Sequence, residues 1–230
     1  MNNIKMSYEV FHIENSSEQR NIYTDLIHKY VSQEISHLNS GTINFIDDKK
    51  NYIDFLNNNK YFKPIVTMKV GWVGVWASNY NAWKSLLDSD YDCAMLFEDD
   101  CIVFPNSASN IYNYIKELPE DWDFFSPFVH SNQYHIYNDS YNIGSDNVCK
   151  SYQDWSLACY IVSKNGAKKA LEYVKEQGFD EPVDYFVFNE NTNRFNTYTL
   201  KPDANKYVEL SGVPTTMQDI ETRINLNGSI

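Results

Sequence analysis

The run CAMLFEDD (residues 93–100) gives the strongest indication of fold in this chain. Five consecutive apolar residues, Cys93 to Phe97, are bounded by acidic residues, the pattern of a strand buried on both faces of its sheet. Such strands occur where helices cover both faces of a sheet, so the run predicts an α/β protein. It stops at three consecutive carboxylates, Glu98, Asp99 and Asp100.

Strand and helix patterns alternate on both sides of this run. Further strands are expected at Tyr8–Ile13, Thr42–Ile46, Trp122–Phe125 and Leu157–Val162. Helical spacing of apolar residues predicts helices over residues 18–31, 47–56, 71–87, 111–118 and 163–177, the first after the capping cluster Asn15–Ser17 and the last between Ser163 and Gly178. The alternation predicts one α/β domain with a mostly parallel central sheet flanked by helices. Residues 129–153 are polar and without periodicity, which is typical of a long loop that carries function or moves, and the last 30 residues read as irregular.

Composition limits the classes of partner. The 230 residues carry a net charge of -12, which does not favour nucleic acid or anionic lipid as the main partner. No stretch approaches the roughly 18 consecutive apolar residues of a membrane span, and the amino terminus lacks a basic region followed by a long apolar run, so we expect a cytoplasmic protein. The four cysteines lack zinc-ligand spacing and are expected to be reduced and mostly buried.

The three carboxylates are the first candidate site. Ligands of open α/β sheets bind at the carboxyl ends of strands, where this triplet lies. Alternation along an extended chain would send Glu98 and Asp100 to one side and Asp99 to the other. Like charges so close need a compensating cation or hydrogen-bond donors, and a hard ion such as Mg²⁺ or Mn²⁺ would serve. The alternative is an acidic loop end or a helix cap.

Several segments together resemble the family 25 glycosyltransferases, which include lipooligosaccharide galactosyltransferases of lipopolysaccharide biosynthesis and collagen galactosyltransferases. GWVGVWASNYNAW (residues 71–83) followed by CAMLFEDDCIVF (residues 93–104) is similar to the core of that family. WSLACYIVSKNGAKKAL (residues 155–171) and EPVDYFV (residues 181–187) resemble its later elements, and MSYEVFHIENSSEQR (residues 6–20) has the layout of its opening strand and Arg-bearing turn. The segments occur in the family's order.

The resemblance implies a single GT-A-type, Rossmann-like domain, a UDP-sugar donor and inverting transfer. Asp100 is then the first choice of ligand to Mn²⁺ or Mg²⁺, with Glu98 as a second ligand. Asp99 or Glu98 would instead hold the donor ribose or a metal-bound water. Ser78 would hydrogen-bond near the nucleotide. Arg20 would meet the donor phosphate, or else form a surface ion pair.

Inverting transfer needs a base that takes the proton of the acceptor hydroxyl, and a carboxylate is the usual choice. Asp184 in the Pro-Val-Asp element is the candidate base and Asp154 the runner-up. The alternative for Asp184 is a helix cap after Pro182. Trp155 or Tyr185 would stack on a sugar face, or else belong to the core.

The sequence departs from the family pattern where Asn79 replaces the His that follows Ser, and no histidine follows His135. The leading hypothesis is a metal-dependent transferase that moves galactose or glucose from a UDP-sugar to a hydroxyl acceptor on a glycan or other biomolecule. Alternatives are transfer to a modified base in DNA, with nucleic acid only as acceptor, and an inactive nucleotide- or glycan-binding module. We expect residues 1–128 to bind the donor, residues 129–153 to form a lid, and residues 154–230 to bind the acceptor. The oligomeric state is left open.

Overall fold

A seven-stranded mixed sheet organises the chain, with strand order β2-β1-β4-β8-β6-β9-β7. The computed structural model describes residues 4–12, 17–35, 39–44, 58, 68–129, 131–152, 157–179, 181–204, 208–210 and 223–224. The strands are β1 (Met6–His12), β2 (Asn39–Asn44), β4 (Cys93–Glu98), β6 (Phe124–Ser126), β7 (Val148–Lys150), β8 (Cys159–Ser163) and β9 (Thr197–Leu200).

The strand directions confirm the mostly parallel sheet. β1 is parallel to both β2 and β4, and β6 is parallel to β9. β8 runs antiparallel between β4 and β6, and β7 runs antiparallel to β9. All strands of this sheet except β7 and β8 therefore point the same way, and their carboxyl ends meet at one edge.

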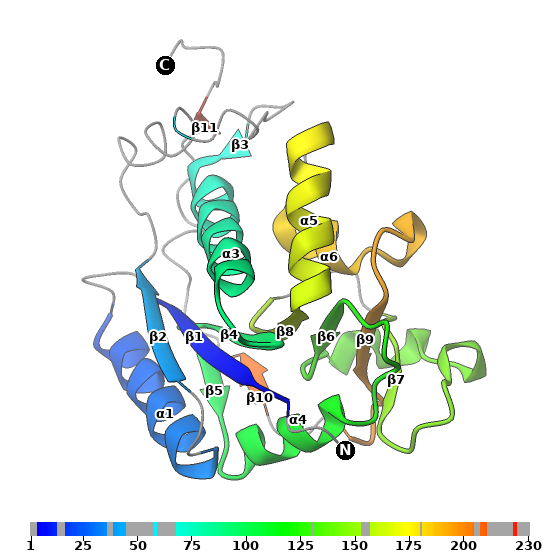
Figure 1. Cartoon of the computed structure of the whole chain (residues 1–230). Coiled ribbons are helices and arrows are strands. Elements are labelled where there is room, and N and C mark those ends of the chain that lie inside the picture. The colour runs from blue at the N-terminus through cyan, green and yellow to red at the C-terminus, as the bar shows by residue number, and fades with distance from the viewer. Residues whose placement is uncertain are drawn as a thin grey trace.

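Helices cover both faces of the sheet (Figure 1). The helices are α1 (Glu18–Glu34), α3 (Val70–Asp88), α4 (Ser107–Ile115), α5 (Lys164–Gln177) and α6 (Val183–Phe188). One apolar core joins α3, α5 and α6 to the sheet, and a second core joins α1 and α4 to the opposite face. Short strands β5 (Cys101–Val103) and β10 (Val208–Leu210) pair antiparallel, as do β3 (Met68–Lys69) and β11 (Arg223–Ile224).

β4 shows why the sequence pattern predicts the fold. Its side chains alternate, so Ala94 and Leu96 enter the core beneath α3 while Met95 and Phe97 enter the core above α1 and α4. All four are buried, as the continuous apolar run predicts. The tryptophans Trp76 and Trp83 of α3 are also buried and belong to the core.

Polar residues set the helix starts as expected. The Ser17 hydroxyl accepts a hydrogen bond from the Arg20 amide at the start of α1, and the Ser163 hydroxyl accepts one from the Gly166 amide at the start of α5. Gly178 ends α5 with a φ of 79°, in the region that glycine tolerates best. These caps fix where each helix leaves its strand.

Two expectations need correction. Residues 129–153 are not simply a loop: they contain the 3-10 helices η1 (Ser131–Ile136) and η2 (Asp139–Tyr141) and the edge strand β7. These elements are too short to produce a periodic pattern. The apolar spacing of α1 also fails at one position, since Ile22 is exposed, whereas Ile27 and Val31 are buried as the spacing predicts and Arg20 and Thr24 are buried with them.

Other predictions fall outside the described residues, namely the helix over 47–56 and the candidate site residues Asp154 and Trp155. All four cysteines are buried and free of disulfides, as expected. Among the helices of the described ranges, none has the length and apolar character needed to cross a bilayer.

Candidate functional site

The site forms where β1 and β4 end side by side. The parallel register pairs Phe11 with Glu98, so the next residues along, His12 and Asp99, are neighbours. Asp99 and Asp100 lie in the turn that leaves β4. α1 begins shortly after β1 and brings Arg20, in its first turn, to the same edge. Chain segments some 80 residues apart therefore meet at the carboxyl ends of the strands.

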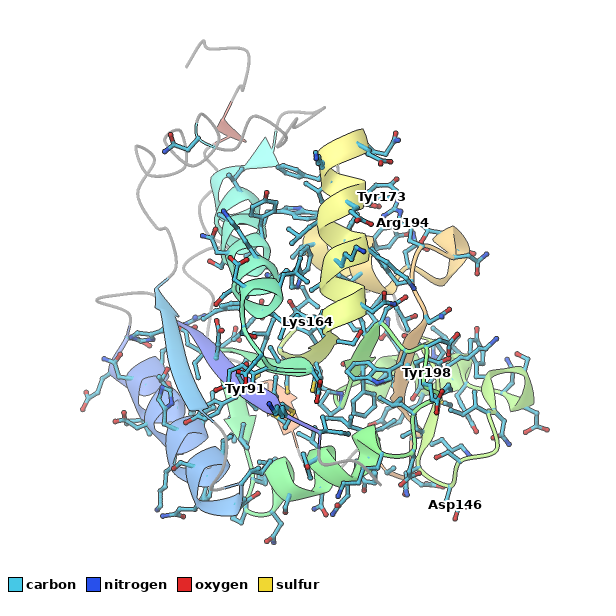
Figure 2. All side chains as sticks on the ribbon, in the orientation of Figure 1. Tyr91, Asp146, Lys164, Tyr173, Arg194 and Tyr198 are labelled. Atoms are coloured by element: carbon cyan, nitrogen blue, oxygen red, sulfur yellow. The ribbon has the colours of Figure 1, made fainter. Side chains whose placement is uncertain are left out.

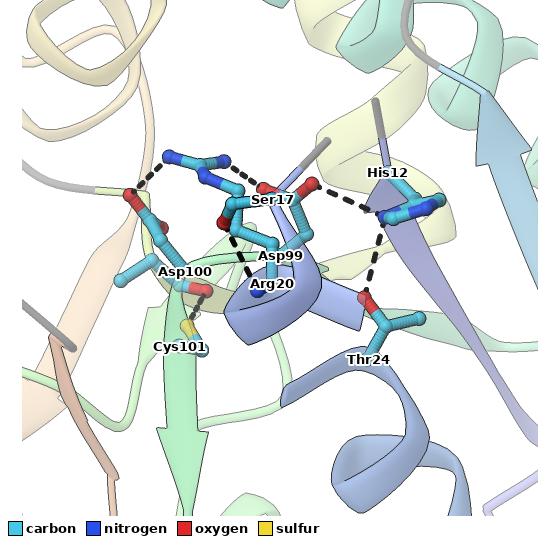
Figure 3. A network of polar contacts seen from close by, with 8 residues as sticks. His12, Ser17, Arg20, Thr24, Asp99, Asp100 and Cys101 are labelled. Atoms are coloured by element: carbon cyan, nitrogen blue, oxygen red, sulfur yellow. Dashed lines mark hydrogen bonds and ion pairs between the residues drawn. The ribbon is translucent and has the colours of Figure 1, made fainter. Parts of the chain in front are cut away.

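Arg20 bridges the two aspartates (Figure 3). Its Nη1 donates to Oδ1 of Asp99, and its Nη2 lies 3.4 Å from Oδ2 of Asp100. The three side chains are buried, so the surface ion pair considered for Arg20 is wrong. The prediction that Asp99 and Asp100 point to opposite sides is also wrong, because both lie in a turn rather than in extended chain.

His12 is a member of this site that the sequence analysis did not identify. Its Nδ1 lies 3.2 Å from Oδ2 of Asp99 and 3.4 Å from the Thr24 hydroxyl. Both carboxylate oxygens of Asp99 are thus in contact with basic side chains. This leaves less of Asp99 for a ribose or a metal-bound water than was expected. The position of His12 near the carboxyl end of the expected strand Tyr8–Ile13 was a signal in the sequence, but it does not show that β4 lies alongside.

Negative charge dominates the remainder of the site. Burial raises the pKa of Glu98 well above its ordinary value, and Asp100, Asp184 and Asp99 raise it further, against the opposing effect of Arg20. Burial also raises the pKa of Asp100, with Arg20 again opposing. The carboxylates are close enough to repel one another, so the site would gain from additional positive charge.

Asp100 has one carboxylate oxygen that a cation could contact. Its Oδ1 is buried and has no hydrogen-bond partner, an arrangement that is costly unless a ligand satisfies the atom. Within the described ranges, no group of three or more His, Cys, Asp or Glu residues is arranged to hold a metal. Magnesium-type ions in phosphate-transfer sites commonly use one or two carboxylates and take other ligands from substrate phosphates and water. The unpartnered Oδ1 of Asp100 fits such an ion, and Glu98 lies close enough for the Asp100 charge to raise its pKa.

Ser78 and Asn79 lie on α3, and both are buried. The Ser78 hydroxyl is buried without a hydrogen-bond partner. Asn79, which replaces the family's histidine, donates from Nδ2 to the Val75 carbonyl oxygen and accepts from the Tyr160 hydroxyl. Tyr160 in turn accepts a hydrogen bond from Nε1 of Trp83. Asn79 therefore completes a buried polar network between α3 and β8.

Asp184 lies in the first turn of α6, where its Oδ1 accepts a hydrogen bond from the Tyr185 amide at 2.9 Å. The helix-cap alternative for Asp184 is wrong, because Pro182 holds the cap position and Asp184 lies inside the first turn. Asp184 lies close enough to Glu98 for its charge to raise the pKa of Glu98. Asp184 therefore belongs to the same acidic site. Tyr185 is exposed, so the core alternative is wrong for its ring.

This chain belongs to glycosyltransferase family 25. The model of that family, described as "Glycosyltransferase family 25 (LPS biosynthesis protein)", matches residues 2–187. The match spans the β1–α1 unit, α3, the acidic triplet and α6, which are the elements that build the site.

Known proteins similar to this chain include one sequence relative and two solved structures. The lipooligosaccharide biosynthesis protein lex-1 of Haemophilus influenzae is 26% identical over 142 residues, which cover 56% of this chain and 46% of that protein. The match thus spans about half of that relative's length. Among solved structures, a glycosyltransferase involved in glycosylation of the major capsid of PBCV-1 has a TM-score of 0.50 at 11% identity, covering 93% of this chain and 96% of that one. Its likeness supports the GT-A-type fold. A Drosophila β-1,4-galactosyltransferase 7 complex with manganese, UDP-Gal and xylobiose has a TM-score of 0.47 at 11% identity, covering 97% and 78%.

Proposed function

We propose that this protein is a metal-dependent, inverting glycosyltransferase that moves a hexose, galactose or glucose, from a UDP-sugar to a hydroxyl group of an acceptor. Membership of family 25 supports the class of reaction. The observation that carries the proposal is the buried, unsatisfied Oδ1 of Asp100 in a cluster of repelling carboxylates at the carboxyl edge of the sheet. A donor diphosphate is itself negative, and it could approach these acids only together with a cation.

Asp100 would be the first protein ligand of a Mn²⁺ or Mg²⁺ ion, and Glu98 the second. When bound, such an ion supplies positive charge that stabilises a departing nucleoside diphosphate. Arg20 holds Oδ2 of Asp100, so the other oxygen of that carboxylate is the one available to the ion. His12 and Arg20 hold Asp99, which we propose fixes the turn rather than touching the ion.

Asp184 is the proposed base. It is only partly buried, so an acceptor hydroxyl can approach its carboxylate. Its backbone hydrogen bond to the Tyr185 amide occupies Oδ1 and fixes the orientation of the side chain. As the acceptor oxygen attacks the anomeric carbon, Asp184 would take the hydroxyl proton. Tyr185, exposed on the same turn, would stack on an acceptor sugar.

The test compares UDP-sugar turnover by the wild type and by Asp100→Asn, each with and without Mn²⁺. The variant should lose turnover by orders of magnitude while its unfolding transition remains cooperative, because it removes a ligand charge without changing side-chain shape. Asp90→Asn, an exposed carboxylate elsewhere, is the matched control and should keep full activity. A thermal-shift screen with UDP-Glc, UDP-Gal and UDP-GlcNAc identifies the donor first.

Unchanged turnover in Asp100→Asn would exclude the metal role. Metal-independent nucleotide binding without any turnover would instead favour an inactive binding module, and stimulation by DNA would favour a modified base as acceptor.

A further inference from the structure

A cavity of about 340 Å³ lies away from the acidic site. Its wall comes from η2, the end of β7, the end of α6 and the residues that lead into β9, around Tyr198 (Figure 2). Small-molecule pockets in proteins usually measure about 300 to 1,000 Å³. This cavity is at the small end of that range, which suits one or two rings rather than a whole nucleotide-sugar.

The cavity and the acids occupy opposite edges of the sheet. Thr197, the first residue of β9, and Lys150, the last residue of the antiparallel β7, both line the cavity. The cavity is therefore at the amino ends of the parallel strands, whereas Asp99 and Asp100 follow the carboxyl end of β4. β9 and β4 are also three strand positions apart, roughly 14 Å at a spacing of about 4.8 Å.

The lining has the chemistry of a sugar site. Amide and hydroxyl side chains make up much of it, and both groups donate as well as accept hydrogen bonds, as sugar hydroxyls require. The half-buried ring of Tyr141 adds flat apolar surface for the C–H face of a sugar, whereas Phe195 and Tyr198 line the wall with rings that pack mostly into the cores. Among the described lining residues only Lys150 carries a charge, so the cavity is not built for a diphosphate.

Two of the lining amides are held in place by the protein. Oδ1 of Asn189 accepts a hydrogen bond from the Asn191 amide at 3.0 Å, and Nδ2 of Asn196 donates to the Asp121 carboxylate at 2.9 Å. A third, Asn193, takes the left-handed conformation with a φ of 49°, which asparagine tolerates better than most residues. Orienting such groups before binding lowers the entropy cost of capturing a ligand.

We propose that this cavity binds one sugar unit of a neutral glycan, without metal and without the donor. α6 links it to the candidate base, since Asp184 is in the first turn of that helix and Val187, near its end, lines the cavity. A glycan held here would be anchored about one helical turn of α6 from that base and three strand positions from β4. Binding of a simple hexoside at this cavity does not depend on whether the protein is a transferase.

The test is saturation-transfer NMR and titration of the full chain with methyl glucosides, methyl galactosides and their disaccharides, with chelator and without nucleotide. At least one of these ligands should bind. Asn193→Gly, which keeps the left-handed backbone and removes the amide, should weaken binding by about threefold to tenfold, the value of one neutral hydrogen bond. Tyr141→Ala should weaken it as well.

Controls separate this site from the acidic one. Asn113→Ala, an exposed asparagine on α4, and Asp100→Asn should bind the hexoside like the wild type. Failure of every hexoside to bind would overturn the proposal. The proposal would also be overturned if Asp100→Asn lost hexoside binding while Asn193→Gly kept it, because the sugar would then bind at the acids. Binding of inorganic phosphate alone, abolished by Lys150→Gln, would identify an anion site instead.

Discussion

Replacing Arg20 by methionine tests the charge arrangement of the acidic site directly. The change keeps a long side chain that suits a helix but removes the only guanidinium that contacts Asp99 and Asp100 among the described contacts. The Arg20 side chain is 4% exposed, and those of its two partners are 1% and 9% exposed. Solvent therefore cannot replace the lost cation.

The magnitude follows from this burial. Removing one member of a buried ion pair leaves the partner charge uncompensated and typically costs about 3 to 5 kcal/mol. Asp99 keeps its contact with His12, which moderates the loss, while Asp100 already has one oxygen without a hydrogen-bond partner. We expect Arg20→Met to lower the free energy of unfolding by about 3 kcal/mol or more.

The assay is urea unfolding in the presence of chelator, so that no adventitious metal compensates the acids. Lys5→Met is the control, because Lys5 and its partner Asp90 are 63% and 81% exposed, and its unfolding should match that of the wild type. Adding Asp99→Asn to Arg20→Met should recover part of the stability, since the double variant no longer buries the same unpaired charge. Equal stability of Arg20→Met and the wild type would show that Arg20 does not neutralise these carboxylates.

Three further predictions concern the scaffold and its pH dependence. Gly166→Ala should lower the free energy of chemical unfolding by about 1 to 3 kcal/mol, because the new Cβ would overlap the backbone carbonyl of Asp123. Lys168→Ala on the same helix should be nearly neutral, and similar values for the two variants would refute the packing argument. Burial lowers the pKa of His28 below its ordinary 6.5, so the unfolded chain binds this proton more tightly, and the free energy of unfolding should fall as pH drops below that value. His28→Gln should weaken this fall in a series of urea unfolding curves at different pH, and an unchanged pH dependence would contradict the prediction. Tyr160→Phe should cost about 1 to 3 kcal/mol in urea unfolding by leaving buried polar partners unsatisfied, and a neutral result would show that the network adjusts without the hydroxyl.

Sequence reasoning succeeded where one physical requirement dominated. The run from Cys93 to Phe97 has to be buried on both faces, and the structure places it in the interior of the sheet. The sequence also predicted the position of the acids, because the residues that directly follow a central strand lie at the edge of the sheet where its strands end. Ser163 and Gly178 were readable for a similar reason, because helix ends need specific side chains or backbone conformations.

The pairing of strands that are far apart in the sequence could not be predicted. The contact of His12 with Asp99 depends on β1 lying beside β4, and nothing in the local pattern of either strand specifies that register. Position 22 of α1 was misread for a related reason. Periodicity ranks Ile22 above Arg20 as a core residue, yet Arg20 is buried because carboxylates from another strand receive it.

The charges of the site explain why the same residues serve both stability and function. Glu98, Asp99, Asp100 and Asp184 interact at one edge of the sheet, and Arg20 opposes their charge. Arg20 and His12 are directed at Asp99, so the compensation is unequal, and Asp100 keeps a buried oxygen without a hydrogen-bond partner. A site that needed only to fold would be more stable with that oxygen satisfied. Its unsatisfied state is the feature that a bound cation would resolve, and this links the cost in stability to the proposed capture of a diphosphate.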